Sequence, residues 1–291
     1  MESGYESDGM IENSVIAMYG SCHSLQDAKM MFDKSSRSDP VTWSSIIAVY
    51  SHANQAEEAL KLFYHMHIER VEPNKAIFVC VIDACAILGA HDQGLMTHAY
   101  AVEMNYDQDM IVQNALVNLY GKCGSLPDAR SMFDSIAEPD DFSWASMMGA
   151  YSSCGCSNEV LDLFYRRWHV KSGEPDNTCF TCILLACNHD GRVDESVHLF
   201  MSMVENYQLL GNKDQYLCMV DLLGRSGSLD AAENLAKRLP PEHASSAWQC
   251  VLAACRVHID VERGVRAAIE CLNLDPDDPA PYILLSNLYA S

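Results

Sequence analysis

Two short motifs in the sequence carry side chains that could bind zinc and transfer protons. They are His67-Ile68-Glu69 and Cys179-Phe180-Thr181-Cys182. Zinc-dependent nucleobase deaminases combine H-x-E with P-C-x-x-C, which together supply the metal ligands and a general acid/base. Here no proline precedes Cys179, and the two motifs lie 110 residues apart in predicted helices whose packing already accounts for them. We therefore expect no deaminase site, and we expect that the chain is not an enzyme.

Thirteen cysteines also suggest zinc ligands or disulfides. Their number is odd, and the acidic start MESGYESDGM lacks the apolar core of a secretory signal, so free thiols in a reducing compartment are expected. Pairs such as Cys154-x-Cys156 have the spacing of metal ligands. Many of the cysteines, however, share a place in a sequence repeat, which indicates packing of small apolar side chains. Such shared places are held by Cys85, Cys187 and Cys255, and by Cys22, Cys123 and Cys154. We expect no metal and no other cofactor.

The composition limits which classes of protein are possible. The chain has 291 residues, of which 49% are apolar, too many for a disordered segment. No apolar run reaches the roughly 18–20 residues that span a bilayer. Forty acidic residues against 19 basic ones give a net charge of −21. Because affinity for nucleic acid usually depends on Lys and Arg at the phosphates, this charge opposes sequence-independent binding.

The sequence repeats itself, and the repeat predicts the elements that position any functional side chain. Residues 13–33 and 114–134 are identical at 11 of 21 positions, at an offset of 101. The same offset relates Val41-Thr42-Trp43-Ser44 to Phe142-Ser143-Trp144-Ala145, and an offset of 102 relates Ala84-Cys85 to Ala186-Cys187. Three different motifs therefore alternate. Periods of this kind are typical of solenoids.

Each motif has the pattern of two helices. In the motif that begins at Pro40, apolar residues recur at helical spacing in two runs separated by a polar break, and Pro73 prevents continuation. The two runs are Trp43, Ile46, Ile47, Tyr50 and then Ala59, Leu62, Phe63, Met66. Neither helix could bury its apolar face alone, so successive hairpins must stack into an all-α solenoid with a continuous core.

Side chains at matching places of the motifs are interpreted as core. The twentieth place is almost always small, which allows the two helices of a hairpin to approach closely. It is filled by Ala28, Ala59, Gly94, Ala129, Val160, Ser196, Ala232 and Gly264. Four residues later lies an aromatic series of Phe32, Phe63, Phe133, Phe164 and Phe200, with His98 as the exception. Recurrence in every motif favours packing over a cofactor site.

These residues resemble the pentatricopeptide repeat proteins of plant organelles, in which short, standard and long motifs alternate. The resemblance implies a right-handed α-α superhelix of stacked hairpins. It divides the chain into a tail at 1–8 and motifs at 9–39, 40–74, 75–109, 110–140, 141–176, 177–212 and 213–244. Residues 245–291 resemble the C-terminal extension of the RNA-editing subfamily. Its first motif would be 245–278, and its second would begin at Pro279 and lack its second helix.

What the resemblance implies is recognition of single-stranded RNA, one base per motif. The fifth residue of a motif bonds the Watson–Crick edge and the last residue orients it. Asn13 with Asp39 and Asn114 with Asp140 would favour uracil, and Ser44 with Asn74 would favour adenine. The predicted core of the target is U-A-N-U. Weaker positions are Val79 with Asp109, Ala145, and Thr181 with Asn212, followed by Leu217. The second residues would sandwich the bases: Met10, Val41, Ile111 and Phe142.

The polar residues of these pairs have a second interpretation. Asp or Asn between two helices often caps the next helix, and this would explain Asp39, Asn74 and Asp140 without RNA. Asn13 and Asn114 could likewise be caps. Three competent pairs in register with the repeat favour base recognition.

Few basic residues lie where phosphates would pass. Lys122 and Arg225 occupy matching places just past a first helix and are candidate phosphate contacts. We expect weak, salt-sensitive binding, with a partner or further motifs supplying much of the affinity.

A protein-binding scaffold remains the main alternative, because residues 274–290 are close to a tetratricopeptide hairpin. The resemblance also implies that the extension recruits a deaminase and accessory editing factors, so both roles can coexist. It implies a mitochondrial or chloroplast protein. We expect neither a membrane nor DNA as a partner.

Overall fold

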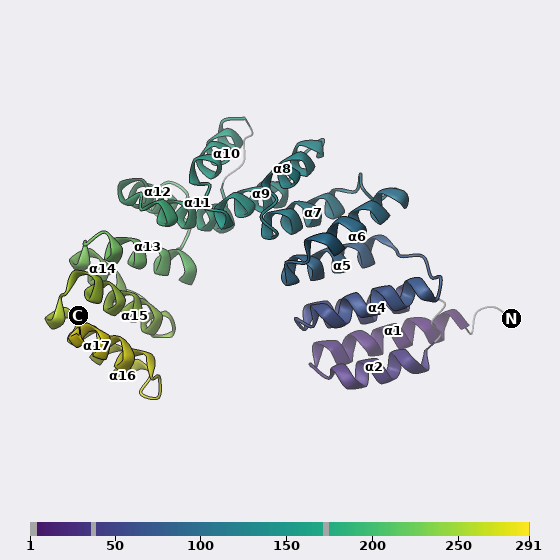
Figure 1. The fold of residues 1–291 in the computed structure, drawn as a ribbon, viewed down its shortest axis with the longest axis horizontal. Coiled ribbons are helices and arrows are strands. Elements are labelled where there is room, and N and C mark those ends of the chain that lie inside the picture. Colours follow the sequence, from purple (N-terminus) through teal and green to yellow (C-terminus); the bar gives the residue numbers. More distant parts are fainter. Residues whose placement is uncertain (1–4, 36–38, 171–174, 291) are drawn as a thin grey trace. The chain divides into compact units, whose positions relative to one another are not determined.

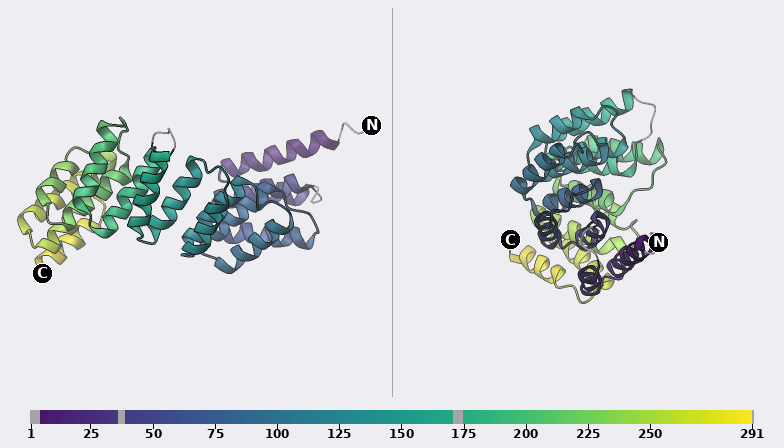
Figure 2. Two further views of the ribbon diagram at one scale, coloured as in Figure 1. Left: turned by 90° about the horizontal axis from the view of Figure 1, so that it is seen from above. Right: turned by 90° about the vertical axis from the view of Figure 1, so that its right-hand side faces the viewer.

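A computed structural model describes residues 5–35, 39–170 and 175–290. This part of the chain contains seventeen α-helices and no β-strand. Two compact units divide the chain, an N-terminal unit at Met1–Ala150 and a C-terminal unit at Tyr151–Ser291. Each consists of antiparallel helix pairs stacked side by side (Figure 1), as further views of the same ribbon also show (Figure 2). The predicted all-α fold of stacked helical hairpins is confirmed.

The N-terminal unit holds four complete hairpins and most of the first helix of a fifth. Its helices are α1 (Tyr5–Ser21), α2 (Leu25–Lys34), α3 (Pro40–His52), α4 (Ala56–Ile68), α5 (Lys75–Leu88), α6 (His91–Glu103), α7 (Met110–Lys122), α8 (Leu126–Ser135) and α9 (Asp141–Ser153).

The C-terminal unit begins within α9 and continues through eight further helices. They are α10 (Ser157–Val170), α11 (Asn177–Asp190), α12 (Val193–Glu205), α13 (Lys213–Arg225), α14 (Leu229–Ala236), α15 (Pro241–His258), α16 (Val261–Leu274) and α17 (Ala280–Ala290).

The hairpin turns share one backbone feature that the sequence does not display. A residue with positive φ lies at the fifteenth place of each of eight predicted motifs. Five of these eight residues are glycine, for example Gly124 with a φ of 76°. Glycine suits this left-handed conformation because it has no Cβ. The full series is His23, Asn54, Gly89, Gly124, Gly155, Gly191, Gly227 and Ile259. One turn geometry therefore closes every hairpin.

Stacking separates the helices into two layers within each unit. First helices pack on first helices: α1 on α3, α3 on α5 and α5 on α7 in the N-terminal unit, and α11 on α13, α13 on α15 and α15 on α17 in the C-terminal unit. Second helices lie against their own first helix and the next one, as α4 does between α3 and α5 and α14 does between α13 and α15. The first-helix layer carries the fifth-place side chains that were predicted to contact bases.

The predicted core positions are buried. All eight residues at the twentieth place are buried, from Ala28 to Gly264. The aromatic series packs against the next hairpin in the same way at both copies of the repeat. Phe32 meets Trp43 edge-on with ring centroids 4.7 Å apart, and Phe133 meets Trp144 at 5.0 Å. Edge-to-face contacts of this kind add to the gain from burial.

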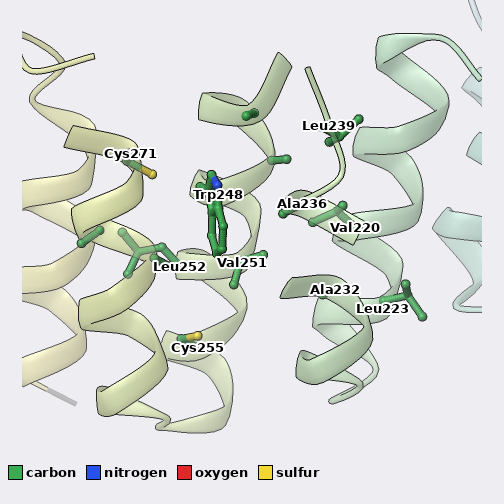
Figure 3. Packing of buried hydrophobic residues seen from close by; sticks show 14 of the residues in the cluster. Val220, Leu223, Ala232, Ala236, Leu239, Trp248, Val251, Leu252, Cys255 and Cys271 are labelled. Carbon is green, nitrogen blue, oxygen red and sulfur yellow. The ribbon is translucent and has the colours of Figure 1, made fainter. Parts of the chain in front are cut away.

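In the C-terminal unit, one apolar cluster connects the last repeat to the extension. Trp248 and Leu252 of α15 lie between Val220 and Ala236 on one side and Cys271 of α16 on the other (Figure 3). The cluster also takes in Leu288 of α17. The extension is thus packed on the last repeat by the same kind of contact that joins the repeats.

An ionic network joins the same elements at the surface. Glu233 of α14 accepts from Lys237 Nζ at 2.8 Å and forms an ion pair with Arg263 Nε of α16 at 3.0 Å. Arg263 also pairs with Asp230. The pKa of Glu233 is lowered, chiefly by its hydrogen bond from Lys237, with further attraction from Arg266 and Arg263. A carboxylate that is mostly buried yet surrounded by cations favours its charged form.

Six helices, α3, α5, α7, α9, α11 and α13, begin at the first residue of a predicted motif. Two do not. Helix α1 begins at Tyr5, inside the segment expected to be a separate tail, and residues 1–4 of that tail lie outside the described residues. Helix α15 begins at Pro241, four residues before the predicted boundary at 245, because proline is favourable in the first turn of a helix. The motif at 141–176 has one extra residue near its end at 173–176, and of these residues 173 and 174 are also outside the described part.

Candidate nucleic-acid interface

The pair of Asn114 and Asp140 is joined by the fold. Asn114 lies in α7, and its side chain hydrogen-bonds the Asp140 carboxylate, which precedes α9. Asp140 Oδ1 also accepts from the Ser143 N–H and hydroxyl, both at 2.8 Å. Burial alone would raise the pKa of Asp140, but these bonds lower it, so the carboxylate stays charged. The Asn114 amide is thereby held with its N–H toward Asp140.

The other end of the Asn114 amide has no partner. Its Oδ1 is buried without a hydrogen bond, and the residue is 3% exposed. An unpaired buried acceptor costs about 1–3 kcal/mol. A donor that reaches this oxygen would remove that cost, and neighbouring side chains must move for a base to do so.

Asn13 and Asp39 occupy the equivalent places three motifs, or 101 residues, earlier in the chain. Asn13 lies in α1, half-buried, and its Oδ1 is also buried without a partner. Asp39 precedes α3 and accepts from the Val41 N–H at 3.1 Å and from the Thr42 hydroxyl at 3.4 Å. The orphaned amide oxygen therefore recurs at both motifs that were predicted to favour uracil.

Ser44 borders a surface groove. The groove has a volume of about 490 Å³ and lies between α1 and α3, lined also by Ser45, His23 and His52. Asn74, the predicted partner of Ser44, accepts from the Ile77 N–H at 3.0 Å and so keeps its amide N–H groups available.

The weaker positions differ among themselves. Val79 and Ala145 are half-buried and carry no hydrogen-bonding group. Asp109 accepts from the Ile111 N–H and from Lys75 Nζ, each at 3.0 Å. Burial would raise the pKa of Asp109, but the Lys75 bond and the backbone bonds lower it.

The hydroxyl of Thr181 is fully occupied. It donates to the Asn177 carbonyl at 2.8 Å and accepts from Asn212 Nδ2 at 3.3 Å and Gln215 Nε2 at 3.1 Å. Asn212 and Gln215 also form a reciprocal capping box at the start of α13. The structure thus brings Thr181 and Asn212 together, but it leaves the hydroxyl little capacity to contact a base. Leu217 is half-buried in the same helix.

The four predicted sandwich residues are all exposed, as are many other large apolar side chains of this chain. The exposed fractions are 74% for Met10, 52% for Val41, 52% for Ile111 and 64% for Phe142. Each lies in the first turn of a first helix, or in the first two turns for Met10. Their placement beside the fifth-place residues fits contact with base faces.

The interpretation of the polar residues as helix caps is confirmed in part. Asp39, Asn74 and Asp140 each accept a backbone N–H at the start of the following helix. Asp109 and Asn212 do the same. For Asn13 and Asn114 it is wrong, because these residues lie inside α1 and α7. Capping and orientation of a base-contacting residue are compatible, since a carboxylate has two oxygens.

The candidate phosphate contacts have different surroundings. Lys122 is exposed at the end of α7 and lies near Asp83. Arg225 bonds Asp221 at 3.0 Å and also donates to the Asn188 carbonyl at 2.6 Å. A guanidinium that is already paired offers less to a phosphate, and this i,i+4 pair is visible in the sequence.

Three polar side chains near the predicted pairs were missed by the sequence reasoning. Thr42, Ser143 and Gln215 occupy the third place of their motifs, are buried, and hydrogen-bond the pair of the preceding motif. The offset of 101 aligns Thr42 with Ser143, and this recurrence of a hydroxyl at the third place was the only sign of their role in the sequence. It did not indicate which neighbour each hydroxyl would contact.

The two motifs that suggested zinc lie on different hairpins. His67 and Glu69 are exposed on or just after α4, whereas Cys179 is buried in α11. Within the described residues, no group of three His, Cys, Asp or Glu side chains could hold a metal ion. Nor does this part of the chain contain a helix long and apolar enough to cross a membrane.

Comparison with known proteins agrees with this architecture. The family described as PPR repeat matches residues 41–71, 114–138, 142–166 and 178–207. A mitochondrial pentatricopeptide repeat-containing protein of Arabidopsis thaliana is 33% identical over 282 residues, covering 96% of this chain and 50% of the relative. Another mitochondrial member from the same plant is 36% identical and covers 98% and 41%. A chloroplastic one is 33% identical and covers 100% and 34%.

Among solved structures, the pentatricopeptide repeat protein PPR10 in complex with an 18-nt psaJ RNA element aligns with a TM-score of 0.74 at 15% identity. The alignment covers 96% of this chain and 42% of that one. The maize PPR10 structure aligns at 0.58. The fold and repeat define a helical-repeat protein, and the matches identify the class: this chain belongs to the pentatricopeptide repeat family. It spans half or less of the length of these relatives.

Proposed function

We propose that this chain is a sequence-specific single-stranded RNA-binding protein that recognises a U-A-N-U core, one base per motif. It would serve as a specificity factor in organellar RNA processing, with C-to-U editing the favoured case, and it would belong to the subfamily with alternating motifs and a C-terminal extension. The deaminase would act in trans or in a part of the protein outside this chain. Relatives named mitochondrial and chloroplastic support an organelle as the site of action.

One observation carries the proposal: the buried, unpaired Oδ1 of Asn114 beside a charged Asp140. Since the amide N–H is directed to Asp140, the oxygen is the atom left for a base. Uracil presents a donor, N3–H, at the centre of its Watson–Crick edge, whereas cytosine presents an acceptor there. An amide oriented in this way therefore favours uracil. Ile111 and Phe142, both exposed, supply apolar contact for the base faces.

The test is fluorescence anisotropy with a short RNA containing U-A-N-U and a scrambled RNA of the same composition. We expect tighter binding to U-A-N-U. Replacing Asn114→Ser together with Asp140→Asn should shift the preference at the last base from U toward A, because this pair then matches Ser44 with Asn74.

A matched control is Asp109→Asn, which changes the same kind of helix cap in a motif where Val79 has no hydrogen-bonding group. It should leave base preference unchanged. If neither the RNA sequence nor the double substitution matters, the proposal is wrong.

A protein-binding role for the extension is a second candidate. It is favoured by the exposed apolar side chains of Tyr282, Ile283 and Tyr289 on α17. Such a surface suits a deaminase or an accessory editing factor, and contact there would not compete with RNA on the fifth-place residues. Sequence-insensitive RNA binding in the anisotropy assay would leave this role as the better explanation.

A further inference from the structure

At several junctions between motifs, a buried polar side chain from the following motif contacts the predicted base-reading pair. Ser143 is fully buried and hydrogen-bonds Asp140, and Thr42, 2% exposed, hydrogen-bonds Asp39. Gln215 is fully buried and donates to Thr181 itself. All three occupy the third place of their motif. At other junctions the third place holds Ile77 or Val112, which have no hydrogen-bonding side chain. The third-place Cys179 hydrogen-bonds Asp176, but the fifth residue of that preceding motif is Ala145, which has no group to position.

We propose that the third residue of the following motif is a positioning residue for base selection: the hydroxyls of Thr42 and Ser143 strengthen the choice of uracil over cytosine by the preceding motif. The proposal rests on the proposed function, since it assumes that Asn13 and Asn114 contact bases. It adds to the pair of fifth and last residues a third determinant that lies in the next repeat and does not touch RNA.

The physical reason is the orientation of an amide. Asp140 holds the N–H side of Asn114, which leaves Oδ1 for the uracil N3–H. If the amide turned over, its N–H would face the base and would suit the N3 acceptor of cytosine instead. The orientation is therefore only as firm as the carboxylate that imposes it.

The Ser143 hydroxyl bonds both the carboxylate and the backbone of Asp140. It donates to Asp140 Oδ1 at 2.8 Å, and the same hydroxyl accepts from the Asp140 N–H at 3.3 Å. Without the hydroxyl, the Ser143 N–H remains as a bond to the carboxylate, at 2.8 Å. Removal should thus loosen the carboxylate without releasing it.

Gln215 shows the opposite outcome of the same position. Its longer side chain accepts from the Asn212 N–H and also donates to the Thr181 hydroxyl directly. Together with Asn212 it saturates that hydroxyl, so the motif at 177–212 should accept any base. The third residue therefore either supports base selection or cancels it, depending on its reach.

The experiment compares binding constants for three RNAs that differ at one base: U-A-N-U, U-A-N-C and C-A-N-U. Ser143→Ala should lower the U-over-C preference at the last base about three- to tenfold, the equivalent of one hydrogen bond, and leave the first base unchanged. Thr42→Val, which keeps the side-chain shape, should lower the U-over-C preference at the first base and leave the last base unchanged. Ser143→Thr should keep the wild-type preference, because threonine retains the hydroxyl and Thr42 is the natural residue at the equivalent place.

A structural role alone predicts a different result. If the hydroxyl only caps α9, Ser143→Ala would lower the melting temperature and weaken all three RNAs equally, and the inference would be overturned. It would also be overturned if Ser143→Thr were as defective as Ser143→Ala, or if both U-over-C ratios stayed at the wild-type value. Wild-type protein that does not distinguish U-A-N-U from a scrambled RNA would instead refute the proposed function itself.

Discussion

Replacing Gly121 with alanine should destabilise the N-terminal unit, although alanine is the better helix former. Gly121 lies in α7, next to Ala150 of α9 in the following hairpin. A Cβ added there would lie 2.4 Å from Ala150 Cβ and 2.9 Å from Ala150 Cα. Ordinary contacts of this kind begin at 3.4 Å. Because one of the atoms belongs to the backbone, the two helices must separate.

The magnitude follows from two opposing effects. Glycine to alanine inside a helix gains about 1 kcal/mol of intrinsic propensity. Overpacking of a close contact costs about 1–3 kcal/mol, and more where backbone must shift. We expect a net loss of about 1–2 kcal/mol in the free energy of unfolding, measured by urea denaturation followed by circular dichroism. RNA affinity should fall too, since Asn114 lies two turns earlier on the same face of α7.

The chain offers a matched control. Gly9 lies inside α1, and a Cβ there would meet nothing within 4 Å. Gly9→Ala should therefore leave stability unchanged or raise it by up to about 1 kcal/mol. Adding Ala150→Gly to Gly121→Ala should recover part of the loss, since the 2.9 Å contact with Cα remains. The reasoning would be refuted if Gly121→Ala and Gly9→Ala shifted the urea midpoint in the same direction.

Four further outcomes are expected. A plot of the logarithm of the RNA-binding constant against the logarithm of the salt concentration should have a shallow slope. Lys122→Gln should reduce the magnitude of this slope by about 0.7, the contribution of one phosphate contact to a single strand. An unchanged slope would exclude the contact. Glu233→Gln should lower stability by about 1–3 kcal/mol near neutral pH. Because the folded pKa of Glu233 is depressed, the wild-type advantage should be present above the unfolded value of about 4.3 and disappear as pH falls through the folded value, as urea midpoints across pH would show. Ile259→Asn should stabilise the C-terminal unit by about 1 kcal/mol, because a β-branched residue is strained at a φ of 57°, and a lower melting temperature would contradict this. Alkylation at neutral pH, located by mass spectrometry, should be fastest at the exposed Cys22 and Cys154, since burial raises the pKa of core thiols to about 11 or 12.

Repetition made most of the fold predictable from the sequence. Helical spacing of apolar residues indicates a helix, and the same spacing at an offset of 101 indicates the same hairpin, so the small residues such as Ala28 and Ala129 could be assigned to the core without any structure. The start of α15 could not be obtained in this way. It depends on Pro241, a local signal in the first turn that overrides the period.

The candidate site was less predictable, for a physical reason. Register places Asn114 and Asp140 on neighbouring hairpins, but hydrogen-bond partners depend on which side chain of the next hairpin lies within 3 Å. Periodicity carries no information about that distance. It could not show that the Asn114 oxygen is unpaired, or that Gln215 occupies the Thr181 hydroxyl. The pairing of Arg225 with Asp221 is different, since their spacing of four residues is a signal in the sequence, although Arg225 was predicted only as a phosphate contact.

The net charge of −21 bears on specificity as well as on affinity. Phosphate contacts strengthen binding to right and wrong sequences alike, because every nucleotide carries the same charge. A protein with few available cations has a small sequence-independent contribution, so its binding must come largely from base edges and base faces. Each mismatched base then removes a larger share of the total. An acidic repeat protein should therefore bind RNA weakly while distinguishing sequences well, and a short array gains discrimination from the same charge that lowers its affinity.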